Sequence, residues 1–446
     1  MKAKLIAAVL LLTISSGTVF SQSFNKAKLD SLLDILATKD KAMGSLTISQ
    51  NGTVLYSRAI GYSFISPAEK IPSTDKTKYR IGSISKLFTA TMILQLVEER
   101  KLSLTETVDK YFPTLPNANK ITIDNLLHHR SGLHNFTNDP SYQTYMTQPK
   151  THDEMLAIIS GTKVDFEPNE KFAYSNSNYV VLGYLIEKIS GQSYATFLAN
   201  RITSKIGLSS TFVGAKTDVK NNESFSYRFM NDWVQAPETD MSIPGGAGAL
   251  VSTPGDLTKF IEALFASKLV SSASLNQMKT MIDGYGMGLF QIPFGTKKAF
   301  GHNGGIDGFQ SNLAYFPDDA LAIAYCTNGV VYPMNDVLIG VLRIYFNDPY
   351  SIPTFKSLPP FDVKTEDLDK YLGIYSSEKI PMKITITKNG ATLIAQATGQ
   401  SSFPLEATEK DKFRFEAAGI NMEFNPDKNE FTLKQGGQNI VFSKEK

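Results

Sequence analysis

The feature that most constrains this chain is a serine and a lysine three residues apart at the start of an apolar helical segment. Ser83 and Lys86 lie in the segment GSISKLF, and the apolar pattern that follows predicts a helix over residues 87–99. Positions three apart lie on one face of a helix, so the Ser83 hydroxyl is expected beside the Lys86 amine. A serine hydroxyl becomes a nucleophile when a neighbouring base takes its proton, and a lysine with a lowered pKa can do this. The pair predicts covalent acyl transfer, although by itself it also fits a helix-start serine followed by an exposed lysine.

Two later segments carry polar groups that suit the same chemistry. Tyr174 and Asn176 form a Tyr-x-Asn triplet in a polar loop before an apolar helical run, for which Gly191 is the expected stop. Residues 301–309 read GHNGGIDGF and lead into a predicted strand at 313–316. Glycines at this density allow the backbone to approach a ligand closely. Together with the serine–lysine pair, these segments favour an active site over a chance match.

In this order, the three segments resemble the motifs of the serine β-lactamase and penicillin-binding-protein superfamily, which are S-x-x-K, Y-x-N and K-T-G or H-x-G. The likeness is to the class C β-lactamase-like branch, which includes esterases, D-aminopeptidases and D-Ala-D-Ala carboxypeptidases. Two further family-like stretches, residues 126–133 and 245–257, lie between the motifs. The resemblance covers about residues 25–350. It implies an α/β fold with a β-lactamase/transpeptidase-like antiparallel sheet, flanking helices and a helical subdomain.

The resemblance also implies a role for each motif residue. Ser83 would be the nucleophile and Lys86 the base, with Tyr174 sharing the proton transfer and helping to activate the deacylating water. Asn176 would bind substrate and orient Lys86. The oxyanion would lie between the backbone N–H groups of Ser83 and Gly305. The other expected substrate-binding residues are His302, Asn303, Gly304 and Gly305.

Some of these residues have alternative interpretations. Tyr174 also fits a buried aromatic residue with a satisfied hydroxyl, and His302 also fits a structural loop histidine. His128 and His129 are interpreted as structural, because the matching family histidine looks structural. In the third motif, His302 and Asn303 replace the lysine and threonine of K-T-G. A neutral histidine binds a carboxylate more weakly than an ammonium, so the motif favours substrates without a carboxylate there over β-lactams.

The sequence therefore predicts an exported serine hydrolase that works through a Ser83 acyl-enzyme. Its substrate would be a small molecule or peptide carrying an ester or amide bond, as for an esterase or a D-specific peptidase. The alternative on the same scaffold is a penicillin-interactive D-Ala-D-Ala carboxypeptidase or a β-lactamase. The alternative of another class is a non-catalytic binding or scaffold protein. The presence of Ser83, Lys86 and Tyr174 together argues against that last alternative.

Composition and spacing exclude several partner classes. The formal net charge of +2 is too balanced to indicate nucleic-acid binding. The sequence has no zinc-ligand spacing, phosphate loop or dinucleotide fingerprint, so neither a metal nor a cofactor is expected. The single cysteine, Cys326, allows no internal disulfide and is expected to be a buried apolar residue. The oligomeric state is left open.

The chain divides into four predicted segments. Residues 1–21 have a positive start and a short apolar core, which predicts a signal peptide and a periplasmic or secreted protein. A retained anchor is the alternative, and no membrane span is expected after signal removal. The hydrolase domain is expected at 25–350, with one hairpin that turns at Asn51-Gly52 and another that turns at residues 317–319. A Pro-rich linker is expected at 351–361. Short alternating strands at 362–446 predict a small β-barrel or sandwich, which resembles the lipocalin-like C-terminal domains of some family members.

Overall fold

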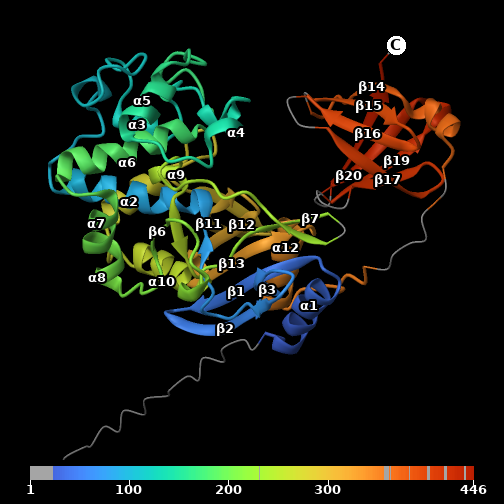
Figure 1. Ribbon diagram of the computed structural model, residues 1–446, viewed down its shortest axis with the longest axis horizontal. Helices are drawn as coiled ribbons and strands as arrows, with labels where there is room; N and C mark the ends of the chain where they lie inside the picture. Colours follow the sequence, from blue (N-terminus) through green and yellow to red (C-terminus); the bar gives the residue numbers. More distant parts are fainter. Residues whose placement is uncertain are drawn as a thin grey trace, which may run out of the picture.

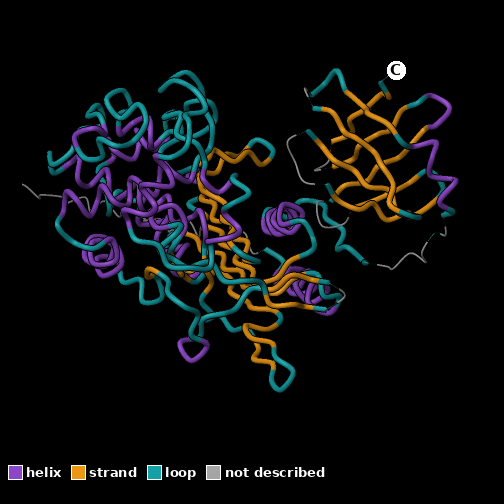
Figure 2. Tube along the Cα trace, turned by 45° about the horizontal axis from the view of Figure 1, so that its top comes forward, coloured by secondary structure: helices purple, strands orange, loops and turns teal. Residues whose placement is uncertain are grey.

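The computed structural model describes residues 24–230, 232–355, 361, 363–380, 382–398, 402–415, 419–435 and 438–445. The predicted signal peptide lies outside these ranges, as do residues 356–360 of the predicted linker. The described chain forms a large part in which helices surround a sheet, and a closed barrel of strands (Figure 1). In Figure 2 the barrel is drawn mainly in the strand colour, whereas the larger part mixes helices and strands.

The main sheet is antiparallel, and its first and last strands in the sequence are neighbours. Ser45 of β1 lies opposite Cys326 of β13. Both hairpins expected in this part are present: β1 turns into β2 at Asn51-Gly52, and β12 turns into β13 through a 3-10 turn at Pro317–Asp319. The strand order is β10 (Phe290–Phe294), β11 (Lys297–Ile306), β12 (Phe309–Phe316), β13 (Leu321–Val330), β1 (Ala42–Gln50) and β2 (Thr53–Ile60).

Strand β13 shows why this sheet is covered on both faces. Its residues are buried almost without interruption, and successive side chains of a strand point to opposite faces. Leu321, Ile323 and Tyr325 enter one hydrophobic core, whereas Ala322 and Cys326 enter the other. Small side chains thus face one layer and large ones the opposite layer. Cys326 is buried in this strand, as expected.

Different helices cover the two faces. On one face α1 (Lys26–Thr38) and α12 (Met334–Tyr345) pack together over the sheet (Figure 1). On the other face α10 (Pro254–Phe265) lies against the sheet and joins the larger core of the helical region. The other helices of the large part are α2 (Ser85–Glu98), α3 (Ile123–Leu127), α4 (Tyr142–Tyr145), α5 (His152–Ser160), α6 (Asn176–Ser190), α7 (Tyr194–Leu198), α8 (Ser204–Ile206), α9 (Gly245–Gly248) and α11 (Ser272–Lys279).

Helix α2 is the centre of the helical region. Every residue from Ser85 to Leu96 is buried, as expected for a helix that is apolar on all sides. Phe88 stacks on Phe260 of α10, with ring centroids 3.7 Å apart. Helix α6 packs beside α2 and ends at Gly191, whose φ of 67° is left-handed. A glycine accommodates this backbone without steric cost, which explains the predicted stop.

Short strands connect the helical region to the sheet. The three-stranded sheet β5-β9-β6 places Arg80 just before the serine–lysine segment, and the hairpin β7-β8 carries Arg228. The bounds of these short strands are β3 (Tyr62–Ile65), β4 (Lys70–Pro72), β5 (Tyr79–Arg80), β6 (Phe212–Val213), β7 (Tyr227–Phe229), β8 (Trp233–Gln235) and β9 (Leu250–Ser252).

The C-terminal part is a closed barrel, which decides between the two architectures expected for it. Strand β14 pairs with β21, and this pairing closes the ring. Alternate residues of each strand enter an interior with its own core, which includes Phe413, Phe424 and Phe431. The strands are β14 (Gly373–Ser376), β15 (Lys383–Asn389), β16 (Thr392–Ala397), β17 (Phe403–Glu409), β18 (Lys412–Phe415), β19 (Ile420–Asn425), β20 (Glu430–Gln435) and β21 (Gln438–Lys444).

Candidate active site

The sequence predicts Ser83 at the start of a helix, and the structure places it in the turn that directly precedes the helix. It is the middle residue of a 3-10 turn, η1 (Gly82–Ile84), which runs directly into α2. Gly82 has a φ of 51° and lies against Gly305, so a Cβ at Gly82 would be only 2.8 Å from the Gly305 nitrogen. The turn is tight because β11 passes so close to it. The continuous helical winding still places Lys86 beside Ser83.

The Lys86 amine is buried among three oxygen atoms. Its Nζ is 2.9 Å from Ser83 Oγ, 2.8 Å from Asn176 Oδ1 and 2.8 Å from the Ala247 carbonyl oxygen. The side chain is completely buried, and this burial holds the pKa of Lys86 well below its ordinary value of 10.5. A neutral amine has two hydrogens and one lone pair. The two carbonyl oxygens can only accept, so the lone pair is left facing the Ser83 hydroxyl.

Asn176 is held so that its carbonyl oxygen faces Lys86. It begins α6, and its backbone N–H donates to Asn135 Oδ1 at 3.0 Å. Its side-chain Nδ2 donates to Thr137 Oγ1 at 3.1 Å. Because the amide nitrogen has this partner, the amide oxygen is left to accept from Lys86 Nζ. This oxygen is therefore held 2.8 Å from the amine, and the orienting role of Asn176 stays a prediction.

Tyr174 lies beside the same two residues. Burial raises the pKa of its hydroxyl well above the ordinary value of 10, and a contact with the Ser83 side chain opposes this rise. The Lys86 Nζ lies 4.9 Å from the centre of the Tyr174 ring. Tyr174 is therefore a neutral phenol near neutral pH, with a proton that it can donate. The structure brings together all three residues that the sequence nominates as catalytic.

The His129 ring packs against the Tyr174 ring, and His129 also binds the backbone on both sides of Tyr174. The backbone N–H of Ala173 donates to the His129 carbonyl oxygen at 3.0 Å, and that of Ser175 donates to His129 Nδ1 at 3.1 Å. The two rings lie 4.3 Å apart between centroids. Burial holds the pKa of His129 well below its ordinary value, so the ring stays neutral and its Nδ1 can accept the bond from Ser175. These contacts fit the structural interpretation of His129, which fixes both residues that flank Tyr174.

The third motif lies within a strand, whereas the sequence indicates a glycine-rich segment that only leads into one. His302 and Asn303 belong to β11. His302 Nδ1 donates to the Asn303 carbonyl oxygen, and Nε2 accepts from the Tyr285 hydroxyl at 3.2 Å. Burial first, and then the charge of Lys86, lower the pKa of His302 to about 3. The ring is therefore neutral and both nitrogens have protein partners, so His302 offers no fixed charge to a substrate carboxylate.

The glycines after His302 permit close packing of two backbones. A Cβ at Gly304 would lie 1.9 Å from the Ile81 carbonyl oxygen, so only glycine fits there. Gly305 has open space where its Cβ would be, and both Gly305 and Ser83 line the same hollow. This is the arrangement that an oxyanion site between their N–H groups needs. Asn303 Oδ1 accepts from Asn312 Nδ2 on β12.

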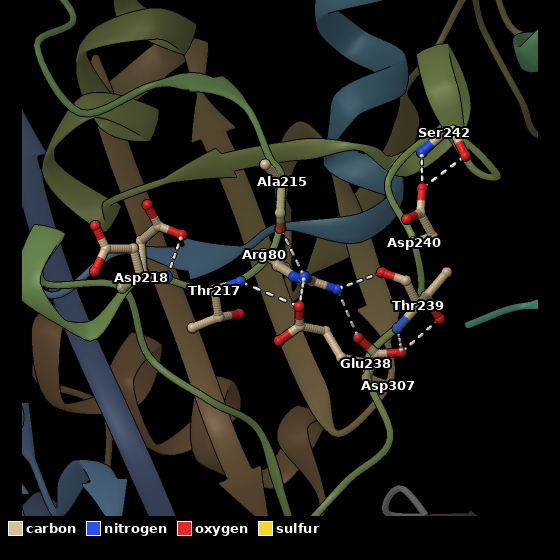
Figure 3. Close-up of polar contacts among 10 residues, drawn as sticks. Arg80, Ala215, Thr217, Asp218, Glu238, Thr239, Asp240, Ser242 and Asp307 are labelled. Carbon is tan, nitrogen blue, oxygen red and sulfur yellow. Dashed lines mark hydrogen bonds and ion pairs between the residues drawn. The ribbon is translucent and has the colours of Figure 1, made fainter. Parts of the chain in front are cut away.

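A buried network of ion pairs joins the segment that precedes Ser83 to the turn that follows Gly305. The sequence patterns did not predict this network. Figure 3 shows the Arg80 guanidinium between two carboxylates, with Asp307 Oδ2 at 3.1 Å and Glu238 Oε1 at 2.9 Å. Asp307 Oδ1 also accepts from the Thr239 N–H and hydroxyl (Figure 3). The Arg80 and Asp307 side chains are 3% and 1% exposed. Burial raises the pKa of Asp307, and its bonds to Thr239 and Arg80 oppose this rise.

Two hollows open beside Ser83. One has a volume of about 960 Å³ and an aromatic lining that includes Phe172, Tyr174, Phe290 and His302. The other has a volume of about 290 Å³ and is lined by residues such as Tyr142, Met146, Asn176 and Ile243. A separate cavity of about 820 Å³ is lined by Arg80 and Thr239 but not by Ser83. The chemistry is therefore placed at the first two hollows.

The described residues hold no group of three or more His, Cys, Asp or Glu side chains arranged to bind a metal. In the same residues, none of the helices combines the length and the apolar character needed to cross a bilayer.

Comparison with known proteins agrees with this fold and site. Residues 34–342 match the Beta-lactamase family, so the chain belongs to that family, and it is a serine hydrolase. It is 28% identical over 436 residues to penicillin-binding protein 4* of Bacillus subtilis (strain 168), covering 90% of this chain and 94% of the relative. It is 27% identical over 311 residues to teichoic acid D-alanine hydrolase of Staphylococcus aureus (strain NCTC 8325 / PS 47), covering 69% of this chain and 68% of that protein.

The structure is similar to that of D-amino acid amidase from Ochrobactrum anthropi SV3 complexed with D-phenylalanine. The TM-score is 0.64 at 26% sequence identity, and the match covers 72% of this chain and 99% of the amidase. The β-lactamase/transpeptidase-like fold expected from the sequence is confirmed.

Proposed function

We propose that the protein is an exported hydrolase that transfers an acyl group from an ester, amide or peptide to Ser83 and then to water. The observation that carries this proposal is the surrounding of Lys86 Nζ. Two oxygen atoms that only accept, from Asn176 and Ala247, take up both hydrogens of a neutral amine. The remaining lone pair faces Ser83 Oγ at 2.9 Å, which is the geometry of a general base and its nucleophile.

Acylation follows from this geometry. Ser83 Oγ attacks the substrate carbonyl carbon while its proton passes to Lys86 Nζ. The carbonyl oxygen, which gains negative charge, is bound by the N–H groups of Ser83 and Gly305. When the intermediate collapses, the leaving group departs with a proton from the Tyr174 hydroxyl, and the Lys86 ammonium restores that proton. Ser83 is then esterified and the other two groups have returned to their resting states.

Deacylation uses the same groups in the opposite direction. A water molecule on the open side of the ester loses a proton to the Tyr174–Lys86 pair as its oxygen attacks the acyl carbon. The bond to Ser83 Oγ then breaks, and Oγ recovers a proton from Lys86. The burial that lowers the pKa of Lys86 favours the neutral amine, which is the form that can act as a base.

A D-configured substrate is favoured among the possible acyl donors. A teichoic acid D-alanine hydrolase and a D-amino acid amidase are both similar to this chain, and each is named for a D-amino-acid derivative. The neutral, fully bonded ring of His302 also makes the third motif a poor carboxylate site. The first choice is therefore a D-aminoacyl ester or amide. The similarity to penicillin-binding protein 4* over most of the chain favours a penicillin-interactive D-Ala-D-Ala carboxypeptidase as the second candidate.

The test is a substrate panel with Ser83→Ala as the control. It should contain p-nitrophenyl esters, the D- and L-forms of alanine and phenylalanine amides, and nitrocefin. We expect ester and D-amide hydrolysis that Ser83→Ala abolishes, with nitrocefin the poorest substrate. Preference for nitrocefin would move the assignment to the second candidate. A folded protein in which a fluorophosphonate probe does not label Ser83 would contradict the acyl-enzyme itself.

Export rests on the first 21 residues, whose charge and apolar pattern are those of a signal peptide. Mass spectrometry of the protein secreted from a host with an intact export pathway should find Gln22 as the first residue.

A further inference from the structure

Arg228 occupies a position shared by both hollows of the active site. The two hollows have five lining residues in common: Ser83, Arg228, Gly305, Ile306 and Asp307. Ser83 and Arg228 thus line the same two hollows, so a substrate bound in either hollow can contact both residues. Among the described residues that line these hollows, Arg228 is the only one with a permanent positive charge.

The Arg228 guanidinium has no partner of its own within the described residues. The side chain is exposed, and neither a hydrogen bond nor an ion pair joins it to another described side chain or backbone group. The nearby carboxylate of Asp307 is already bonded to Arg80 and Thr239. The Arg80 guanidinium, by contrast, is surrounded by carboxylate and carbonyl oxygens. The five N–H donors of Arg228 are therefore available to a molecule bound in either hollow.

The backbone that carries Arg228 is fixed against the strand that carries Gly305. The Gly308 N–H donates to Ser226 Oγ at 3.0 Å, and the Ile65 N–H donates to the Tyr227 hydroxyl at 2.7 Å. A Cβ at Gly308 would lie 2.8 Å from the Tyr227 carbonyl oxygen, so the hairpin and the β11–β12 turn are in direct contact. The contacts of Ser226 with the β11–β12 turn and of Tyr227 with β3 thus fix the backbone next to Arg228.

We propose that Arg228 is a specificity residue that binds an anionic group of the substrate beside the scissile bond. The inference rests on the proposed hydrolase function and names the substrate class more closely. His302 cannot supply a fixed charge, because its ring is neutral and both its nitrogens are bonded within the protein. A guanidinium binds a carboxylate through two parallel N–H donors, and Arg228 has all of its donors free for such a bond.

The anionic group can belong to the leaving group or to the acyl group, and two pairs of esters distinguish these sources. The leaving-group pair is 4-acetoxybenzoate and its methyl ester. The acyl-group pair is monophenyl adipate and its methyl ester. The measurement is the ratio of kcat/KM for the anionic ester to that for its neutral partner, after subtraction of spontaneous hydrolysis, in the wild type, in Arg228→Gln and in Arg100→Gln. Arg100 is a matched control, because it is also exposed and follows the far end of α2.

We expect the wild type to prefer the anionic ester in at least one pair. Arg228→Gln should lower that ratio by about tenfold to a hundredfold, mainly through KM, and Arg100→Gln should not change it. Added salt should weaken the wild-type preference, because an exposed charge is screened. The inference would be overturned if Arg228→Gln lowered kcat/KM equally for both esters of a pair. It would also be overturned if the wild type preferred the anionic ester in neither pair.

Binding of the esters to the Ser83→Ala protein tests the anion site independently of the hydrolase proposal. If the wild type hydrolyses none of the esters, the hydrolase proposal has failed. The anion site is then judged by calorimetry on Ser83→Ala and on Ser83→Ala combined with Arg228→Gln. Tighter binding of the anionic ester that depends on Arg228 supports the site, and equal binding of both esters in both proteins contradicts it.

Discussion

Arg80 and Asp307 form an ion pair that is buried between the two segments carrying Ser83 and Gly305. Their side chains approach to 3.1 Å and are almost fully removed from solvent. Arg80 precedes the η1 turn, and Asp307 lies in the turn between β11 and β12. The pair therefore joins the segment that precedes Ser83 to the turn that follows Gly305. The pair is therefore placed to hold the backbone N–H groups of Ser83 and Gly305 at a fixed separation.

Asp307→Asn should therefore reduce both stability and turnover. The change removes one of the two carboxylates that pair with the buried Arg80 and leaves Glu238 as the other, so we expect a loss of about 1.5–3 kcal/mol of unfolding free energy. If the pair sets the oxyanion geometry, kcat should fall more than KM rises, because these N–H groups bind the transition state more tightly than the substrate. Urea unfolding and steady-state kinetics measure the two effects.

Asp34→Asn is the matched control for this variant. Asp34 pairs with Arg58, but its side chain is 58% exposed, and exposed pairs contribute about 0–1 kcal/mol. The control should stay close to the wild type in both assays. If Asp307→Asn behaves like Asp34→Asn, the positioning role of the buried pair is wrong.

Lys86→Met should slow the reaction of Ser83 with a fluorophosphonate by at least about a hundredfold, the contribution expected of a general base. Methionine is similar in length and removes only the amine, so the fold should persist. Peptide mapping should locate the label on Ser83 in the wild type. The rate of labelling should rise with pH as Lys86 loses its proton. Rapid labelling of Lys86→Met would show that another group activates Ser83.

Tyr174→Phe should lower kcat by about a hundredfold or more and leave thermal stability close to that of the wild type. The change removes only the hydroxyl that we propose donates a proton to the leaving group. Tyr325→Phe is the control, because the Tyr325 hydroxyl is also buried but has no partner among the described residues. Its loss should change neither rate nor stability appreciably. Near-full activity in Tyr174→Phe would remove Tyr174 from the proton transfer.

His302 should make the protein sensitive to acid. The pKa of His302 is about 3 in the folded protein, against an ordinary 6.5. Between these values the unfolded chain binds a proton that the folded protein does not, so the contribution of His302 to stability is lost as pH falls from 6.5 to about 3. The loss amounts to about 1.4 kcal/mol per pH unit. Urea unfolding should give a shallower pH dependence for His302→Gln over this range, and equal slopes would contradict the burial argument.

Local sequence patterns predicted the parts of the fold that depend on neighbouring residues. The Asn51-Gly52 turn, the stop at Gly191 and the strands of the C-terminal part follow from turn chemistry and periodicity. The choice between barrel and sandwich did not follow. It depends on whether β14 pairs with β21, and no local pattern specifies such a distant pairing.

The sequence motifs predicted the candidate catalytic residues, but they did not predict the residues that surround these and hold them in place. The spacing of Ser83 and Lys86 predicts their contact, because one helical turn brings them together. Neither Arg80 with Asp307 nor Arg228 stands out in the sequence, since each is defined by segments that meet only in the folded chain. The roles assigned to Tyr174 and the substrate-binding residues stay predictions until the variants are measured.

The neighbouring positions of β1 and β13 have a consequence for how the molecule is made. The sheet cannot close, and α1 cannot find its partner α12, until synthesis has passed almost the whole hydrolase region. Contacts between such distant segments form slowly. A newly made chain therefore keeps the β13 side of β1 unpaired until β13 has been made. For the export that we propose, this delay would keep the chain extended while it crosses the membrane.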